Sequence, residues 1–128
     1  MTTLIVCLLI AVILPYLAKI PVGYAMQKAG GYNNNYPREQ QAKLEGFGAR
    51  ALAAHQNCFE SLAVFSTAAL TAIATNHVTS SIQLLAIVYI ICRVIYNILY
   101  LMDLAALRST VWFISLVSCI SILWLCIP

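Results

Sequence analysis

Polar side chains gather at the head of an apolar stretch, in the segment RALAAHQNCFE that covers residues 50–60. Successive residues of an α-helix are about 100° apart, so Arg50 and Asn57 fall on nearly the same line. Glu60 follows about one turn later on that side, whereas His55 points well away from it. A cation, an amide and a carboxylate on one helix face are groups that bind a charged ligand or one another.

A second polar stripe occurs in the segment RVIYNILY, residues 93–100. Arg93, Tyr96 and Tyr100 are spaced three and four apart, so a cation and two phenols project from one helix face. A charge near the centre of a bilayer costs about 2.5–3.5 kcal/mol, so such groups face a protein interior, form pairs or serve a ligand. We therefore expect the two stripes to meet and Glu60 to pair with Arg93. Such a pair has a structural interpretation as well as a ligand-binding one.

The composition places both stripes in membrane helices. Hydrophobic residues make up 62% of the 128 residues and charged residues only 9%, against about 25% charged residues in soluble proteins. A bilayer core about 30 Å thick requires about 20 apolar residues in a helix. The chain therefore has room for four spans, which predicts an all-α integral membrane protein with a single four-helix domain over residues 1–128.

The apolar segments define the elements that must position the stripes. The predicted spans cover roughly residues 2–26, 46–74, 80–102 and 109–127. The polar loop between the first two spans, residues 27–45, contains two consecutive glycines, three consecutive asparagines and Pro37. These residues prevent a continuous helix and favour turns.

The positions of Lys and Arg predict the orientation. Four of these residues belong to the first connection and its borders and Arg108 lies in the third, whereas the second has none. The positive-inside rule then places the first and third connections in the cytoplasm and both termini on the other side, and we expect a bacterial inner membrane. The basic residues do not cluster with aromatic residues, so no nucleic-acid partner is expected.

The cysteines and histidines have structural interpretations. The five cysteines are scattered over the predicted spans without a Cys-x-x-Cys pair, so we expect small buried apolar residues. They are Cys7, Cys58, Cys92, Cys119 and Cys126. His55 and His77 lie near opposite ends of the second span, so no metal site is predicted.

Three segments together resemble the MAPEG family, the membrane-associated proteins in eicosanoid and glutathione metabolism. They are Arg50–Glu60, the pattern Arg93-x-x-Tyr96-x-x-x-Tyr100, and Leu107-Arg108-Ser109. The resemblance extends over essentially the whole chain and is closest to microsomal glutathione transferases. It implies a homotrimer of four-helix subunits, with glutathione as co-substrate between neighbouring subunits.

The resemblance also implies roles for individual residues. The family's glutathione-binding and polar-core positions correspond here to Arg50, Asn57, Glu60, Arg93, Tyr96 and Tyr100. Arg108 resembles the cation that stabilises a thiolate in these enzymes, and Ser109 follows it, so both are predicted catalytic residues. Family members commonly carry an arginine at two further positions, where this chain has Ala53 and Leu104.

The implied function is a glutathione-dependent transferase or peroxidase of hydrophobic electrophiles, which reach the site from the membrane. A second hypothesis is a non-catalytic lipid-binding or scaffold protein of the same family, because two customary arginines are replaced. A third is an ion or proton pathway through Glu60, Arg93 and Tyr100. The absence of inverted repeats and broken-helix signals argues against this pathway.

Overall fold

A computed structural model describes all 128 residues of the chain, and its secondary structure consists of helices alone. The long helices are α1 (Thr2–Lys28), α3 (Phe47–Ala74), α4 (Ser80–Leu101) and α5 (Ala105–Trp124). Each of these four is long and apolar enough to cross a membrane. The predicted fold class is confirmed, and the protein is an integral, multi-pass membrane protein.

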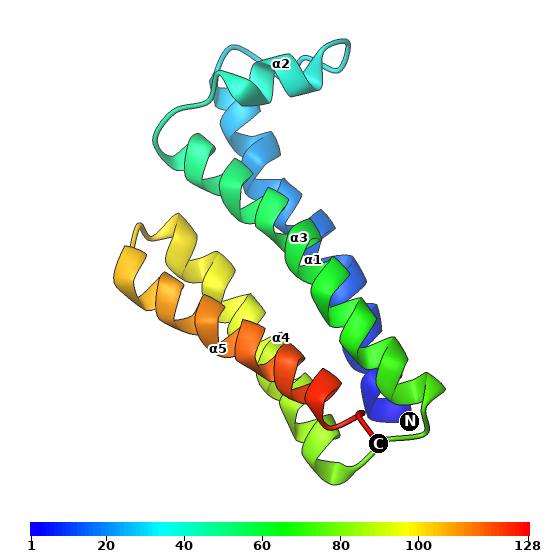
Figure 1. Cartoon of the computed structure of the whole chain (residues 1–128). Helices are drawn as coiled ribbons and strands as arrows, with labels where there is room; N and C mark the ends of the chain where they lie inside the picture. Colours follow the sequence, from blue (N-terminus) through cyan, green and yellow to red (C-terminus); the bar gives the residue numbers. More distant parts are fainter.

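The long helices form two pairs. α1 packs along α3, and α4 packs along α5 (Figure 1). In Figure 1 the two pairs come together at the end that carries the chain termini and separate toward the opposite end. α1 and α3 extend beyond α4 and α5 at that opposite end. There the chain passes from α1 to α3 through the short helix α2 (Pro37–Ala42).

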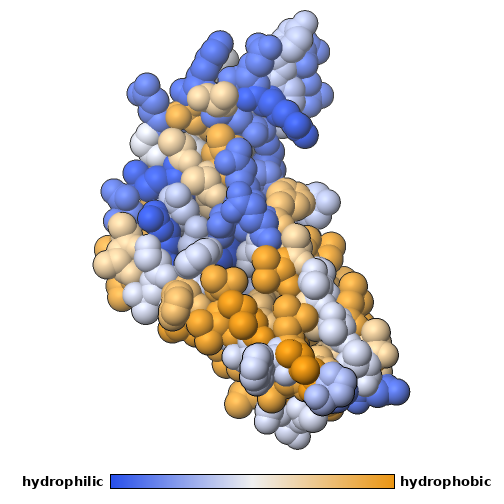
Figure 2. Space-filling view, in the orientation of Figure 1, coloured by the Kyte–Doolittle hydropathy of each residue, from blue (hydrophilic) through white to orange (hydrophobic).

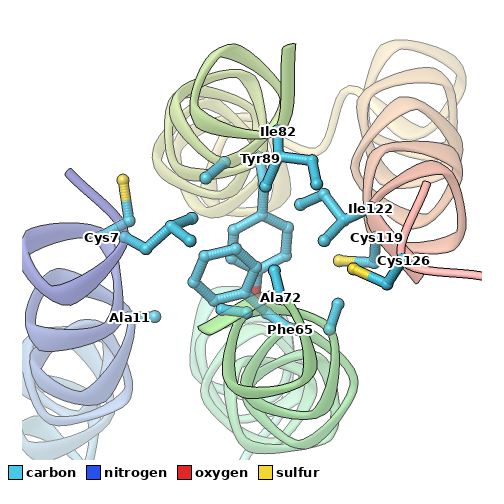
Figure 3. Close-up of a cluster of buried hydrophobic side chains, with 13 residues drawn as sticks. Cys7, Ala11, Phe65, Ala72, Ile82, Tyr89, Cys119, Ile122 and Cys126 are labelled. Atoms are coloured by element: carbon cyan, nitrogen blue, oxygen red, sulfur yellow. The ribbon is translucent and has the colours of Figure 1, made fainter. Parts of the chain in front are cut away.

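The apolar core lies where the two helix pairs meet. It contains 13 buried residues, 12 from the four long helices together with Cys126, which follows α5 (Figure 3). Phe65 of α3 stacks on Tyr89 of α4, with ring centroids 4.1 Å apart. Ala68, Ala69 and Ala72 on α3 are fully buried. Small residues at these positions let helices approach closely, which matters in lipid because apolar burial alone does not drive helix association there.

Two tight connections use the same helix-ending device. Asn76 after α3 and Asp103 after α4 have positive φ angles, 59° and 60°. The residue after each donates its backbone N–H into the preceding helix: His77 to Ala72 O at 2.9 Å, and Leu104 to Leu99 O at 3.0 Å. Asn and Asp tolerate the left-handed conformation better than most residues. The chain therefore reverses sharply twice.

The segment predicted as turns between α1 and α3 includes the short helix α2. Pro37 is its first residue, where the missing N–H and the fixed φ of proline suit a helix start. The Gln40 side chain donates hydrogen bonds to Gly31 O at 2.8 Å and to Met26 O at 3.1 Å. This amide ties α2 to the end of α1, a contact that local turn signals do not reveal.

Candidate functional site

Arg93 lies at the centre of the polar cluster. Its side chain is 1% exposed. Its Nη2 donates to Asn57 Oδ1 at 2.7 Å, and its guanidinium carbon lies 4.1 Å from the centroid of the Tyr96 ring. Nε and Nη1 of Arg93 are buried and have no hydrogen-bond partner. A buried charge is costly unless it is paired and hydrogen-bonded, so this guanidinium has unused donors for an acceptor from outside the chain.

Asn57 stands between Arg93 and Glu60. Its amide oxygen accepts from Arg93, and its Nδ2 donates to Glu60 Oε2 at 3.0 Å. The expected direct pair between Glu60 and Arg93 is therefore wrong. An amide carries both an acceptor and donors, and Asn57 precedes Glu60 by one helical turn, so it links the cation to the carboxylate. Glu60 itself is exposed.

Asn97 and Cys58 complete the inner part of the cluster. Asn97 Nδ2 donates to the backbone oxygen of Arg93 at 2.8 Å, and the Cys58 thiol donates to Asn97 Oδ1 at 3.3 Å. Both groups are satisfied within the chain. They hold the α4 backbone and α3 together beside Arg93, and the contact between them depends on the rotation of both helices.

Arg108 and the two tyrosines extend the cluster toward α5. α5 begins at Ala105, so Arg108 lies in its first turn, and its guanidinium carbon is 4.2 Å from the centroid of the Tyr100 ring. The Tyr96 and Tyr100 rings meet edge to face at 5.6 Å. Two phenols thus lie between two guanidinium groups. A cation at a helix N-terminus adds to the partial positive charge of the backbone there, so this region is strongly electropositive.

Two predicted site residues are not joined to this cluster by hydrogen bonds. Arg50 lies two turns before Asn57 on α3, and its Nε is buried without a partner. Ser109 is exposed on α5.

His55 belongs to a different face of α3. Its Nδ1 lies 2.8 Å from Pro15 O of α1. A carbonyl oxygen only accepts hydrogen bonds, so Nδ1 carries the proton and donates. The imidazole thus packs α3 against α1, away from Asn57 and Glu60, as the helical periodicity predicted.

A cavity of about 150 Å³ opens beside Asn57 and Glu60, among α3, α4 and α5. Ser61 and Tyr89 line it with hydroxyl groups 2.8 Å apart. From α5, Trp112, Ser115 and Cys119 contribute to the wall. The volume suits a few water molecules or one small chemical group, since each water occupies about 30 Å³. No spacing along the chain signals this site, because its walls come from three helices.

The family model described as the MAPEG family matches residues 3–128. The chain belongs to the MAPEG family. This family includes glutathione transferases and peroxidases as well as non-catalytic members. No curated protein and no solved structure matches the chain.

The resemblance to the MAPEG family predicts arginines at two positions where this chain has other residues. Ala53 is half-buried in α3, one turn before Asn57, and Leu104 is exposed immediately before α5. The cations around the polar cluster are consequently Arg50, Arg93 and Arg108.

Proposed function

We propose that this MAPEG protein is a glutathione-dependent transferase or peroxidase that acts on hydrophobic electrophiles at the membrane. The observation that carries the proposal is Arg93, a fully buried cation with two partnerless nitrogens and no carboxylate contact of its own. A buried guanidinium with N–H groups that lack partners favours a carboxylate ligand. The family is associated with glutathione, which brings two carboxylates.

The donors and acceptors at the site fit the groups of glutathione. Arg50 and Arg93 have buried N–H groups without partners, which suit the two carboxylates. The exposed Glu60 carboxylate suits the ammonium group, and Asn57 holds Glu60 in place. Tyr96 and Tyr100 flank the same region and offer phenol groups for positioning the tripeptide.

We propose Arg108 as the stabiliser of the thiolate, on the strength of its place in the first turn of α5. The chemistry that glutathione supplies is its thiol, which reacts as a thiolate, and a free thiol with a pKa of about 8.5 is mostly protonated near neutral pH. Arg108 and the N-terminus of α5 both favour negative charge beside them. The Ser109 hydroxyl adjoins Arg108 and is proposed as a further contact to the sulfur.

A titration of the purified protein with glutathione tests this proposal, together with thiolate absorbance measured against pH. We expect the wild type to bind glutathione and to lower the pKa of its thiol. Arg108→Ala should raise the pKa of the bound thiol by about one unit. At a pH below the pKa of the bound thiol, where the ligand binds as the neutral thiol, the affinity should be nearly unchanged. Lys43→Ala, which removes a cation outside the site, should change neither quantity.

The replaced arginines favour a second candidate function, a non-catalytic lipid-binding or scaffold protein. Ala53 and Leu104 remove two cations that would otherwise hold carboxylates. If the wild type neither binds glutathione nor lowers its thiol pKa, the enzyme proposal fails and this second function replaces it. Arg93, Asn57 and Glu60 would then be a structural network.

We also propose a homotrimer, which the family membership and the partly open polar cluster support. Glu60 is exposed in a single chain at a depth where lipid is an unfavourable neighbour, so another subunit would cover it. Light scattering of the protein in mild detergent measures the number of subunits. A folded, stable monomer would contradict this assembly.

The proposed location is a bacterial inner membrane, with α2 and its flanking segments in the cytoplasm. The basic residues around α2 support this orientation. Asn34→Cys should be protected from an impermeant thiol reagent added to intact cells, and Asn76→Cys should react. The native cysteines are all buried, so background labelling is expected to be low. The reverse labelling pattern would invert the topology.

A further inference from the structure

A pocket of about 360 Å³ lies where the end of α1 meets the connection from α2 to α3 and the start of α3. Its wall contains two cations, one carboxylate and two aromatic rings, which belong to Lys28, Lys43, Glu45, Tyr24 and Phe47. Gly48 also lines the pocket, and a Cβ at this position would lie 3.1 Å from Ala25 Cβ. The absence of a side chain therefore lets α1 and α3 approach closely at this pocket.

The pocket has an excess of positive charge. Two lysines and one glutamate line it, which gives a net charge of +1. Nζ of Lys28 lies 4.9 Å from the centroid of the Tyr24 ring. A cation–π contact orients an ammonium group but leaves its charge in place. Neither lysine forms an ion pair within the chain, so both ammonium groups are available to an anion from outside the protein.

The pocket lies at the headgroup level of a bilayer. α1 contains 27 residues and is therefore about 40 Å long, roughly 10 Å longer than the hydrocarbon core. The excess lies at the α2 end, where α1 extends beyond α4 and α5 and the surface is mainly hydrophilic (Figure 2). Lys28 is the last residue of α1, and Tyr24 precedes it by four residues, about 6 Å. Lys28 thus lies among the headgroups and Tyr24 near the hydrocarbon boundary, where tyrosine is enriched.

Two exposed aromatic rings adjoin the lysines. Tyr24 of α1 and Phe47 of α3 meet edge to face, with ring centroids 6.5 Å apart, and the two side chains are 54% and 39% exposed. A molecule bound here would contact ammonium groups at one end and aromatic rings at the other. An anionic phospholipid has this polarity, whereas inorganic phosphate has no apolar part to contact the rings.

The pocket lies away from the side of α3 that another subunit is proposed to cover. Glu60, which that subunit would cover, follows Phe47 by 13 residues on α3. At about 100° and about 1.5 Å per residue, the two side chains point about 140° apart and are separated by about 20 Å along the helix. The pocket shares no lining residue with the cavity beside Glu60. A ligand in this pocket would therefore leave the proposed glutathione site free.

We propose that this pocket binds the phosphate of an anionic phospholipid between Lys28 and Lys43, with the apolar part of the lipid along Tyr24 and Phe47. Basic residues at the cytoplasmic end of membrane helices attract anionic lipids. Glu45 weakens this attraction, because its carboxylate repels the phosphate. The proposal goes beyond both proposed functions, since it requires neither bound glutathione nor an inactive protein.

Native mass spectrometry of the delipidated protein, with phosphatidylglycerol or phosphatidylcholine added, tests the site. Lys28→Gln/Lys43→Gln should weaken phosphatidylglycerol binding at least about tenfold, because each cation near the headgroups contributes to the attraction. Lys43→Gln alone should weaken it about fivefold. Arg38→Gln is the matched control, since it removes one exposed cation that does not line the pocket, and should have less than about a twofold effect. Phosphatidylcholine should bind weakly to all of these proteins.

Two glutamates allow a matched test of the opposite sign. Glu45→Gln and Glu39→Gln each remove one exposed negative charge, but only Glu45 lines the pocket. Glu45→Gln should strengthen phosphatidylglycerol binding about threefold or more, because a repulsion beside the phosphate is lost. Glu39→Gln should change it less than about twofold. A gain confined to Glu45→Gln would distinguish this pocket from a general effect of net charge.

Several results would overturn the lipid site. They are equal losses in Lys43→Gln and Arg38→Gln, equal gains in the two glutamate variants, and equal binding of both lipids by the wild type. Displacement of phosphatidylglycerol by inorganic phosphate or by glutathione would also overturn it, because the lysines would then bind a soluble anion. Lys28 and Lys43 are exposed, so their variants should fold. Loss of glutathione binding with lipid binding intact would reject only the enzyme proposal.

Discussion

The two ends of the helix bundle are held together by different interactions. Near the termini, the helices meet through closely packed apolar groups, with Phe65 stacked on Tyr89 against small residues of α3. Toward α2, α3 and α4 are joined by hydrogen bonds from Arg93 to Asn57 and from Cys58 to Asn97. In lipid, the first kind of contact gains from close packing, whereas the second gains from satisfying polar groups.

The two ends also differ in how many of their buried polar groups have hydrogen-bond partners within one chain. Four buried side-chain nitrogens have no hydrogen-bond partner, and three of them belong to Arg50 and Arg93. The apolar end has close-packed side chains and the tight turn at Asn76. The proposed ligand site would use the donors without partners at the polar end, and the apolar end would supply the rigid frame. Three substitutions test this division.

The largest expected effect comes from Arg93→Met at the polar end. Glutathione binding should weaken by about 3 kcal/mol, roughly a hundredfold, because a carboxylate of the bound ligand loses its cationic partner. Thermal stability in detergent should be unchanged or higher, since replacing a buried charge with an apolar group of similar volume is often neutral or stabilising. Titration calorimetry and thermal unfolding measure the two effects. A destabilised variant that still binds glutathione would make Arg93 a structural residue.

Phe65→Ala at the apolar end should have the opposite profile. Leaving roughly 100 Å³ unfilled costs about 2 kcal/mol of unfolding free energy at about 24 cal/mol per Å³. The affinity of the folded protein for glutathione should stay the same. Phe113→Ala is the matched control, because Phe113 is 60% exposed and its loss should change stability little. Reduced affinity in Phe65→Ala would show that the two ends are coupled.

The smallest of the three effects is expected for Glu60→Gln. Glutathione binding should weaken by at least about 1.5 kcal/mol, the lower range for a hydrogen bond to a charged group. The fold should be unaffected, because the glutamine side-chain oxygen can still accept from Asn57 Nδ2. Glu45→Gln provides a control at an exposed carboxylate outside the cluster. Unchanged affinity in Glu60→Gln would remove Glu60 from the proposed ligand site.

Several features followed from the sequence because they depend on one helix at a time. Composition and length are sufficient for four membrane spans, since the bilayer sets how many apolar residues a span requires. Helical periodicity placed Arg93, Tyr96 and Tyr100 on a common face, and the structure brings their side chains together. The same periodicity separated His55 from Asn57. Each of these results needs only the angle and the rise per residue.

Relations between helices were decided by the tertiary structure. Asn57 lies between Arg93 and Glu60 because of how α3 and α4 are rotated and shifted against each other. The cavity beside Glu60 likewise joins segments that are distant in the chain. The sequence determined the spans and the direction of each polar stripe. Which polar groups touch was decided only by packing, because helix rotation and translation depend on contacts that periodicity within one helix does not specify.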